Sequence, residues 1–207
     1  MTDQTPTPRS SMKSLRLALW FVVLVAAGFA LYAVTNRPGD PPESGGYADS
    51  VGGPFTLTAA DGSTVTERDL AGKPFAIFFG FTRCPDVCPT TLARLAQLRK
   101  RLGEDGDRFE IVFVSVDPES DSPEDIGNYV ALFDTPIVGL TGTPDQLAQI
   151  TGAYHVFYEK VPIDGGGYTI DHSASVFLMD SDGRLQSIID HHEDADNALA
   201  KLEQLVA

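Results

Sequence analysis

The pattern of hydrophobic and polar positions divides the chain into three segments of different character. Residues 17–34 are eighteen consecutive uncharged, almost wholly apolar residues, enough for a helix that crosses the roughly 30 Å hydrocarbon core of a bilayer. Residues 36–53 are rich in Gly, Pro, Ser and acidic side chains and lack apolar periodicity, which is typical of a flexible tether. From residue 54 to 207, short apolar runs alternate with amphipathic stretches, which predicts a single domain.

Charges on either side of the apolar run predict its orientation. Three basic residues precede it against the single acidic Asp3, whereas Arg37 beyond it is followed by two acidic residues. The positive-inside rule therefore places residues 1–16 in the cytoplasm, makes residues 17–35 a transmembrane anchor and leaves the domain extracytoplasmic. A cleaved signal peptide is the alternative, but its apolar region is usually only about 7–15 residues long. Because no Arg-rich amphipathic presequence precedes the anchor, a bacterial plasma membrane is favoured over a mitochondrial one.

Within the domain the pattern predicts strands and helices that alternate. Residues 55–66 alternate around an Asp-Gly turn and indicate an opening hairpin, and residues 73–81 indicate a buried strand. A helix follows, with four leucines on one face and Pro89 at its first position, where the missing N–H costs nothing. The next elements expected are a strand over 109–117, a helix over 122–133, a strand over 136–140 and a helix over 143–154.

The C-terminal third changes to hairpins and ends in a helix. Residues 155–162 and 165–170 indicate strands around a glycine-rich turn, residues 174–180 and 183–189 indicate an antiparallel hairpin, and an amphipathic helix closes the chain. The βαβα rhythm favours a mainly parallel central sheet with right-handed crossovers and helices on both faces. With the antiparallel hairpin added, the pattern predicts an α/β thioredoxin-like fold: a central mixed sheet flanked by helices, preceded by one N-terminal transmembrane helix.

The charge balance limits the partners. The chain has 15 basic and 29 acidic side chains and a net charge of −14. Nucleic acid and anionic lipid headgroups are therefore excluded as expected partners, whereas cations and basic protein surfaces fit.

Two cysteines, Cys84 and Cys88, are the only ones in the chain and lie between the predicted strand and helix. Unpaired N–H groups and the helix dipole at such a junction favour thiolate over thiol, and thiolates bind soft metals or exchange disulfides. A structural disulfide is the alternative, but closing a five-residue loop yields little entropic stabilisation. Pro89 favours an extended Cys88, which predicts an irregular loop between the cysteines.

Four motifs together resemble the Sco/SenC family of copper-binding cytochrome oxidase assembly proteins, over nearly the whole chain from residue 50 onward. They are GFTRCPDVCPTTL, VSVDPESDSP, FDTPIVGLTGTPDQL and YTIDHSASVFLMDSDGRL. The CxxxC spacing with the downstream Asp-His distinguishes this family from disulfide reductases of the same fold, which usually carry CxxC. The resemblance implies a Cu(I) site formed by Cys84, Cys88 and His172 that delivers copper to the binuclear centre of oxidase subunit II or a similar copper enzyme, after loading by an upstream donor.

The residue chemistry agrees with that implication. Two thiolates and an imidazole form a soft site suited to Cu(I), whereas structural zinc normally has four protein ligands. Three ligands leave room for an incoming ligand to take the ion; binding of Cu(II) as well stays open. His172 is expected in the loop that enters the strand at 174–180, beside the cysteine-bearing strand. Met179 is expected in the core, and no Met-rich or His-rich tract indicates a copper store.

Several other polar residues have two interpretations. Asp171 could orient the imidazole or be a turn carboxylate, and Asp86 could tune the metal or simply favour a turn. His191 and His192 fit a solvated turn better than an accessory metal site, and His155 is expected to be structural.

Three acidic residues follow the second buried strand. Asp117, Glu119 and Asp121 lie where α/β sheets place functional loops. Helix capping is the simpler interpretation, and contact with a partner protein is the alternative.

Two other activities fit the cysteine pair. Cys84 and Cys88 could cycle through a disulfide in a thiol-disulfide oxidoreductase that keeps the target's cysteines reduced and needs no histidine. A peroxidase would use Cys84 as the attacked thiol and Cys88 to resolve the sulfenate. Peroxidases of this fold place Pro and Thr at set positions before the reactive cysteine. Here Thr82 adjoins Arg83 and the proline is missing from that window. The pattern thus favours a copper carrier over an enzyme.

Overall fold

The computed structural model describes residues 16–17, 19–28 and 46–207. Residues 16–17 and 19–28 are helical. The rest of the predicted anchor, residues 1–15 and residues 36–45 of the predicted tether lie outside the described residues. Among the residues that are described, none belongs to a helix with both the length and the apolar character needed to cross a bilayer.

The compact unit runs from Gly46 to Ala207 and so begins before residue 54. A short 3-10 helix, η1 (Tyr47–Ser50), leads into Val51, which is buried. The Gly52 N–H then donates to the Ala153 carbonyl at 2.9 Å. These contacts attach the residues just before the first strand to the domain.

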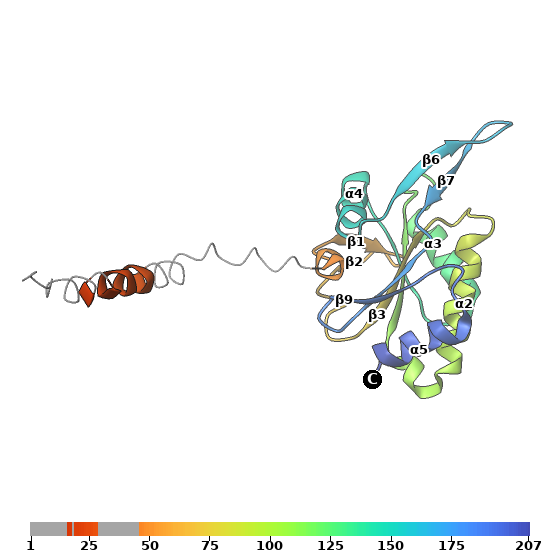
Figure 1. Cartoon of the computed structure of the whole chain (residues 1–207). Helices are drawn as coiled ribbons and strands as arrows, with labels where there is room; N and C mark the ends of the chain where they lie inside the picture. Colours follow the sequence, from red (N-terminus) through yellow and green to blue (C-terminus); the bar gives the residue numbers. More distant parts are fainter. Residues whose placement is uncertain (1–15, 18, 29–45) are drawn as a thin grey trace, which may run out of the picture. The chain divides into compact units, whose positions relative to one another are not determined.

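A seven-stranded mixed sheet forms the centre of this unit, in the order β2-β1-β5-β4-β3-β8-β9 (Figure 1). Its strands are β1 (Thr56–Ala59), β2 (Thr64–Thr66), β3 (Phe75–Gly80), β4 (Glu110–Ser115), β5 (Val138–Thr141), β8 (Val176–Met179) and β9 (Leu185–Ile189). Among these described strands only the β3/β4 and β4/β5 pairs are parallel. The expectation of a mainly parallel sheet is therefore wrong, because an antiparallel hairpin extends each side of the three parallel strands. The mixed α/β sheet and the predicted pairing of β8 with β3 are confirmed.

Four α-helices cover the two faces. They are α2 (Val87–Arg101), α3 (Pro123–Val130), α4 (Pro144–Ala153) and α5 (Ala195–Leu205), with 3-10 turns η2 (Gly103–Arg108) and η3 (Ala131–Phe133). Helices α2, α3 and α5 lie on one face and α4 on the other (Figure 1). Because the chain steps from β3 to β4 to β5 in one direction, two crossovers of the same hand place α2 and α3 together.

The start of α2 differs from the prediction. Val87 is its first residue, so Pro89 is its third and not its first. A proline is accepted there because N–H groups of the first helical turn have no partner within the helix. Cys88 is consequently part of the helix.

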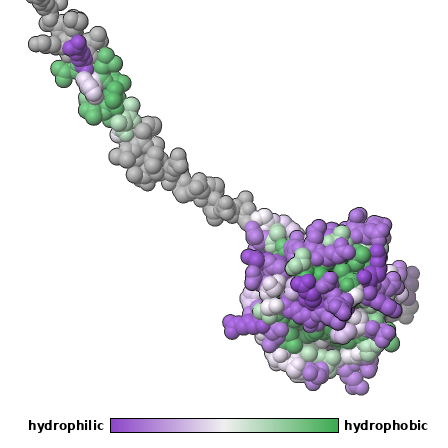
Figure 2. All heavy atoms as spheres, turned by 90° about the horizontal axis from the view of Figure 1, so that it is seen from below, coloured by the Kyte–Doolittle hydropathy of each residue, from purple (hydrophilic) through white to green (hydrophobic). Residues whose placement is uncertain are grey.

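Aromatic side chains of neighbouring β3 positions separate the core into two layers. Phe78 contacts Phe113 on the face covered by α2 and α3, with ring centroids 6.3 Å apart. Phe79 contacts Tyr154 and Phe177 on the other face. Both layers are buried, whereas the outer surface in Figure 2 shows hydrophilic side chains interrupted by hydrophobic patches. Met179 is fully buried, which confirms its predicted place in the core.

A second sheet of two strands projects beyond the seven-stranded sheet (Figure 1). Strands β6 (Tyr158–Pro162) and β7 (Tyr168–His172) pair antiparallel around a tip that contains three consecutive glycines at positive φ, as the pattern predicted. His172 pairs with Tyr158 as the last residue of β7. Its expected place in a loop is therefore wrong, because the hairpin ladder continues through it.

Candidate metal centre

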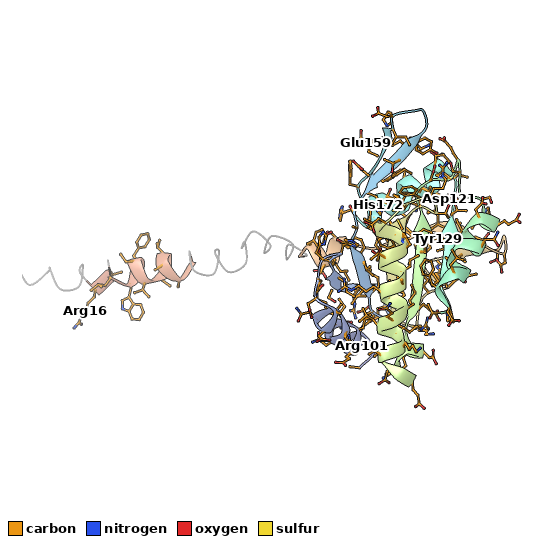
Figure 3. The ribbon with its side chains drawn as sticks, turned by 90° about the vertical axis from the view of Figure 1, so that its right-hand side faces the viewer. Arg16, Arg101, Asp121, Tyr129, Glu159 and His172 are labelled. Carbon is orange, nitrogen blue, oxygen red and sulfur yellow. The ribbon has the colours of Figure 1, made fainter. Side chains whose placement is uncertain are left out.

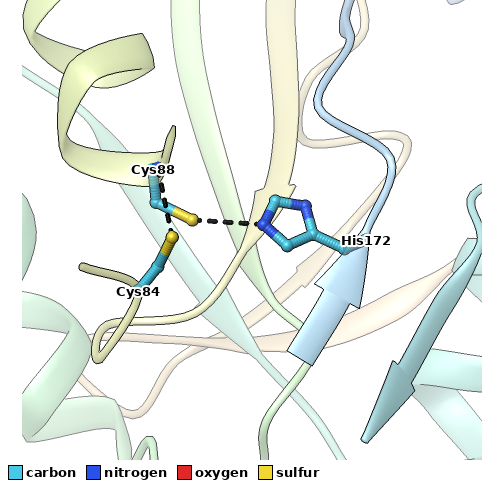
Figure 4. A group of neighbouring side chains, drawn as sticks. All are labelled: Cys84, Cys88 and His172. Atoms are coloured by element: carbon cyan, nitrogen blue, oxygen red, sulfur yellow. Dashed lines mark hydrogen bonds between the residues drawn. The ribbon is translucent and has the colours of Figure 1, made fainter. Parts of the chain in front are cut away.

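The two cysteines occupy the junction between β3 and α2. Cys84 lies in the loop, and Cys88 is the second residue of the helix (Figure 4). The Cys88 backbone N–H, free at the helix start, points at the Cys84 Sγ from 3.3 Å. The path from Cys84 to Asp86 is irregular, as predicted, whereas the expected extended conformation of Cys88 is wrong because the helix already begins at Val87. Both cysteines are free thiols.

His172 reaches this junction from the end of β7. Its Nε2 lies 3.4 Å from the Cys88 Sγ, across a sequence separation of 84 residues (Figure 4). Its Nδ1 lies 3.0 Å from the Ser173 carbonyl oxygen, which can only accept. We therefore assign the proton to Nδ1, so the Nε2 lone pair faces the sulfurs.

The ligand atoms of Cys84, Cys88 and His172 all lie within 4.8 Å of one another. Bonds of about 2.3 Å to sulfur and 2.0 Å to nitrogen place the ligands of a three-coordinate ion roughly 4 Å apart. The geometry thus fits one ion held by all three groups with little movement.

The surroundings shield the centre but leave one side open. Cys88 is completely buried and Cys84 is half-buried. The His172 ring packs edge-on against Phe78 and Phe81, each with centroids 5.9 Å away. A pocket of about 290 Å³ between the cysteine loop and β7 is lined by Cys84 and His172. An ion here would be partly dehydrated yet reachable by an incoming ligand.

Hydrogen bonding shifts the pKa values of the two thiols in opposite directions. The Cys88 thiol donates to Cys84 and, together with the Cys88 backbone N–H, lowers the pKa of Cys84 from 9.0 to about 4, against the effect of its partial burial. The same bond and burial raise the pKa of Cys88. The metal-free site therefore favours a thiolate at Cys84 and a thiol at Cys88, and an ion bound by both sulfurs would displace the Cys88 proton.

Alkylation of Cys84 should depend weakly on pH. An ordinary thiol loses roughly 100-fold in thiolate between pH 8 and pH 6, whereas a thiol with a pKa of about 4 remains ionised throughout. We expect the iodoacetamide rate at Cys84 of the reduced, metal-free protein to change less than about threefold over this range. Peptide mass spectrometry measures the rate, with the urea-unfolded chain as control. A decline in the folded protein as steep as in the unfolded one would contradict the lowered pKa.

Gly80, the last residue of β3, makes room for the buried sulfur. A Cβ at this position would lie 2.6 Å from the Cys88 Sγ and 3.1 Å from the Phe113 ring. The strand and the helix start can approach this closely only because Gly80 lacks a side chain.

Replacing Gly80 with alanine should displace the Cys88 sulfur. We expect a loss of about 1–3 kcal/mol in the free energy of unfolding, as for other overpacked cores, together with weaker metal binding. Urea denaturation and metal competition measure the two effects. Gly152→Ala is the matched control, because a Cβ there meets open space within α4 and alanine favours helix. Equal effects of the two substitutions would argue against the contact with Cys88.

Comparison with known proteins identifies the family. The family model for SCO1/SenC matches residues 43–207. The chain belongs to the SCO1/SenC family. The resemblance seen in the motifs is thereby confirmed.

Relatives are found among bacteria and in mitochondria. SenC of Rhodobacter capsulatus is 36% identical over 177 residues, which are 82% of this chain and 80% of that protein. The mitochondrial SCO1 homolog 1 of Arabidopsis thaliana is 37% identical over 149 residues, or 72% of this chain and 45% of that protein. The chain thus spans about half the length of this mitochondrial relative. The copper-bound structure of ScoI from Bradyrhizobium japonicum has 43% identity and a TM-score of 0.69, and the match covers 75% of this chain and 99% of that one.

In this SCO1/SenC site, neither Asp171 nor Asp86 hydrogen-bonds to a predicted ligand through its side chain. Asp171 is exposed on β7, and the His172 Nδ1 faces the Ser173 carbonyl instead. The backbone oxygen of Ser173 therefore orients the ring. Asp86 precedes α2 without a side-chain capping bond and accepts from the Thr90 hydroxyl at 3.3 Å.

The remaining histidines lie apart from the three predicted ligands. His191 is half-buried, with Nδ1 3.2 Å from the Thr91 Oγ1, and its ring packs against the exposed His192. His155 is exposed at φ 52° and contacts Ser50 of η1 through Nε2. Within the described part of the chain, the group of side chains arranged so that they could hold a metal ion consists of Cys84, Cys88 and His172.

The acidic loop after β4 plays a different part from the one expected. Asp117 and Asp121 are both fully buried, and Ser122 caps α3, so the capping interpretation is wrong for these residues. Asp121 accepts hydrogen bonds from the N–H and hydroxyl of Thr82, at 2.9 and 2.6 Å, and from Ser115 at 2.6 Å. It therefore ties the loop after β4 to the start of the cysteine loop. Figure 3 shows Asp121 and His172 near the N-terminal end of α2, with Arg101 toward its other end.

Asp117 holds a second set of contacts that the motifs did not reveal. It accepts from Arg83 at 2.7 Å and from the Tyr168 hydroxyl at 2.8 Å. Glu119, although exposed, pairs with Lys160 at 2.8 Å. Since parallel neighbours β3 and β4 end at the same edge of the sheet, the sequence carried a signal that their following loops would meet.

Proposed function

We propose that this SCO1/SenC protein carries one copper ion as Cu(I), bound by Cys84, Cys88 and His172, and transfers it to another copper protein. The observation that carries the proposal is the convergence of two sulfurs and a correctly oriented imidazole within 4.8 Å. Soft sulfur ligands favour Cu(I), and three protein ligands fall short of the four in structural zinc sites. The copper-bound structure of the similar ScoI supports the choice of metal.

Transfer would proceed by ligand exchange. A thiolate or imidazole of the recipient enters through the open side of the pocket, bonds to Cu(I) as one protein ligand leaves, and completes the exchange as the others follow. No electron is gained or lost by the ion. The proposed recipient is the binuclear copper site of cytochrome c oxidase subunit II or a similar enzyme, and an upstream donor loads the chain; the family resemblance supports both.

A thiol-disulfide reductase is the second candidate, favoured by the paired thiolate and thiol. The Cys84 thiolate would attack a disulfide of the target, and one target sulfur would leave as thiolate. Cys88 would then lose its proton, attack Cys84 in the mixed disulfide and release the second target sulfur. The chain becomes oxidised by two electrons and the target becomes reduced. Metal delivery needs reduced cysteines on the recipient, so the two activities are compatible.

The proposed location is a bacterial plasma membrane. Residues 17–35 would be the single anchor, residues 1–16 would lie in the cytoplasm, and residues 36–53 would link the anchor to the extracytoplasmic domain. The support is the apolar run at 17–34 and the charges around it.

A Cu(I) titration of the full-length, reduced chain against a calibrated chelator tests the carrier proposal. We expect a plateau at about one ion per chain, because the ligands form one three-coordinate centre. The same titration on His172→Ala, combined with oxidase activity in cells that carry only this variant, separates the candidates. A variant that loses Cu(I) but restores full oxidase activity would favour the reductase over the carrier.

A further inference from the structure

The hairpin that brings His172 to the cysteines has few apolar contacts with the core. Within β6 and β7, all of whose residues are described, only Ile170 is buried. The hairpin forms a sheet of its own and shares no backbone ladder with the seven-stranded sheet. Besides Ile170 and the partly buried Tyr158 and Tyr168, polar side chains therefore hold its position over the cysteine loop.

Those polar contacts converge on Asp117. The Tyr168 hydroxyl, on β7 four residues before His172, donates to the buried carboxylate at 2.8 Å. The Arg83 guanidinium, directly before Cys84, donates to it at 2.7 Å. Asp117 therefore joins the strand that carries the third ligand to the loop that carries the first.

Two cationic side chains, Lys160 and Arg83, lie over the ring of Tyr168. The Lys160 Nζ lies 4.4 Å and the Arg83 Cζ 5.3 Å from the centre of the Tyr168 ring, both within the range of cation–π attraction. Lys160 also pairs with Glu119 at 2.8 Å. Hydrogen bonds to a buried charge are about twice as strong as neutral ones, so the bond from Tyr168 to Asp117 is a strong polar anchor of the hairpin.

We propose that Tyr168 is a positioning residue that latches the β6–β7 hairpin to Asp117 and Arg83, and thereby sets how firmly His172 engages the ion bound by the cysteines. Here "the latch" means Asp117, Tyr168, Arg83, Lys160 and Glu119. When the latch is closed the ion has three ligands, and when it opens the histidine withdraws with the hairpin and leaves the two sulfurs. The copper role of the latch rests on the proposed function, whereas its hold on the hairpin does not.

The copper-free test is hydrogen exchange on full-length Tyr168→Phe, which removes one oxygen and keeps the ring. We expect the amides of β6 and β7 to exchange about tenfold faster, from the loss of a hydrogen bond to a charged group. Tyr158→Phe is the matched control: Tyr158 faces His172 in the same hairpin, and its hydroxyl forms none of the hydrogen bonds found in the described part of the chain. Equal exchange in the two variants would overturn the latch.

The copper test is a double-mutant cycle with His172→Ala. Tyr168→Phe should weaken Cu(I) binding by about tenfold in the wild-type background and by less than about twofold when His172 is absent. X-ray absorption of the bound Cu(I) should show less imidazole coordination in Tyr168→Phe than in wild type.

Lys160→Gln, which breaks the pair with Glu119, should give a smaller loss of Cu(I) affinity with the same dependence on His172. Equal losses in both backgrounds would reduce Tyr168 to a general structural role.

The two proposals fail in distinguishable ways. A wild-type chain that does not bind Cu(I) would remove the carrier function and leave the exchange experiment to decide on the latch. If the wild-type chain binds Cu(I) but the effect of Tyr168→Phe does not depend on His172, only the positioning role of Tyr168 is removed.

Discussion

Replacing Cys88 with serine should lower the Cu(I) affinity of the full-length chain by more than about 100-fold. Structural zinc sites with four ligands gain about 10–16 kcal/mol, or roughly 3 kcal/mol per ligand, and a factor of 100 corresponds to about 2.7 kcal/mol. The loss is expected to be large here because Cys88 is completely buried between Gly80 and His172, where a serine hydroxyl is a poor ligand for a soft ion.

Competition with a Cu(I) chelator under reducing conditions measures this loss. Cys84→Ser should behave similarly, and His172→Ala should lose less, because the two sulfurs are the softer ligands. His192→Ala is the control, since this exposed imidazole lies apart from the centre and should retain the wild-type affinity. Stoichiometric, undiminished binding by all three ligand variants would reject the assigned centre.

Replacing Asp121 with alanine should reduce the free energy of unfolding by about 3–5 kcal/mol. The substitution leaves the Thr82 N–H, the Thr82 hydroxyl and the Ser115 hydroxyl without their acceptor in a buried region. Each unsatisfied buried donor costs about 1–3 kcal/mol, reduced where water can enter. Because Thr82 is two residues before Cys84, we also expect the cysteine loop to loosen.

Urea denaturation followed by circular dichroism measures the effect. Glu203→Ala is the control, since Glu203 is exposed within α5 and its loss should change stability by less than about 0.5 kcal/mol. Asp121→Asn keeps the shape and one acceptor oxygen and should fall between the two. Equal denaturation midpoints for Asp121→Ala and Glu203→Ala would show that this buried carboxylate does not hold the loop.

Most strands and helices of the domain could be predicted from local pattern. The alternation around the Asp-Gly turn predicted β1 and β2, and the leucine spacing predicted α2. These predictions succeed because the periods of 2 and 3.6 residues record which side chains face the core. The start of α2 was predicted wrongly, because Pro89 is compatible with several first-turn positions and the structure starts the helix at Val87.

The loop contacts could not be predicted in the same way. Asp117 and Asp121 were recognised as residues at a strand end, but their partners Arg83, Tyr168 and Thr82 lie 34, 51 and 39 positions away. No periodic pattern relates a buried carboxylate to a donor on another loop. Their pairing follows from strand order, because β3 and β4 are parallel neighbours that end at the same edge.

The sequence by itself determined the α/β pattern of the domain, the two cysteines at a strand-to-helix junction and, through its motifs, the SCO1/SenC family. Only the tertiary structure decided that His172 belongs to a hairpin strand, that its Nε2 faces the sulfurs, and that buried aspartates tie the hairpin and the cysteine loop together. The physical reason is the sequence separation of the residues that interact. Backbone conformation and amphipathicity are set by neighbours along the chain, whereas a metal centre and its support depend on groups that meet only after the sheet has assembled.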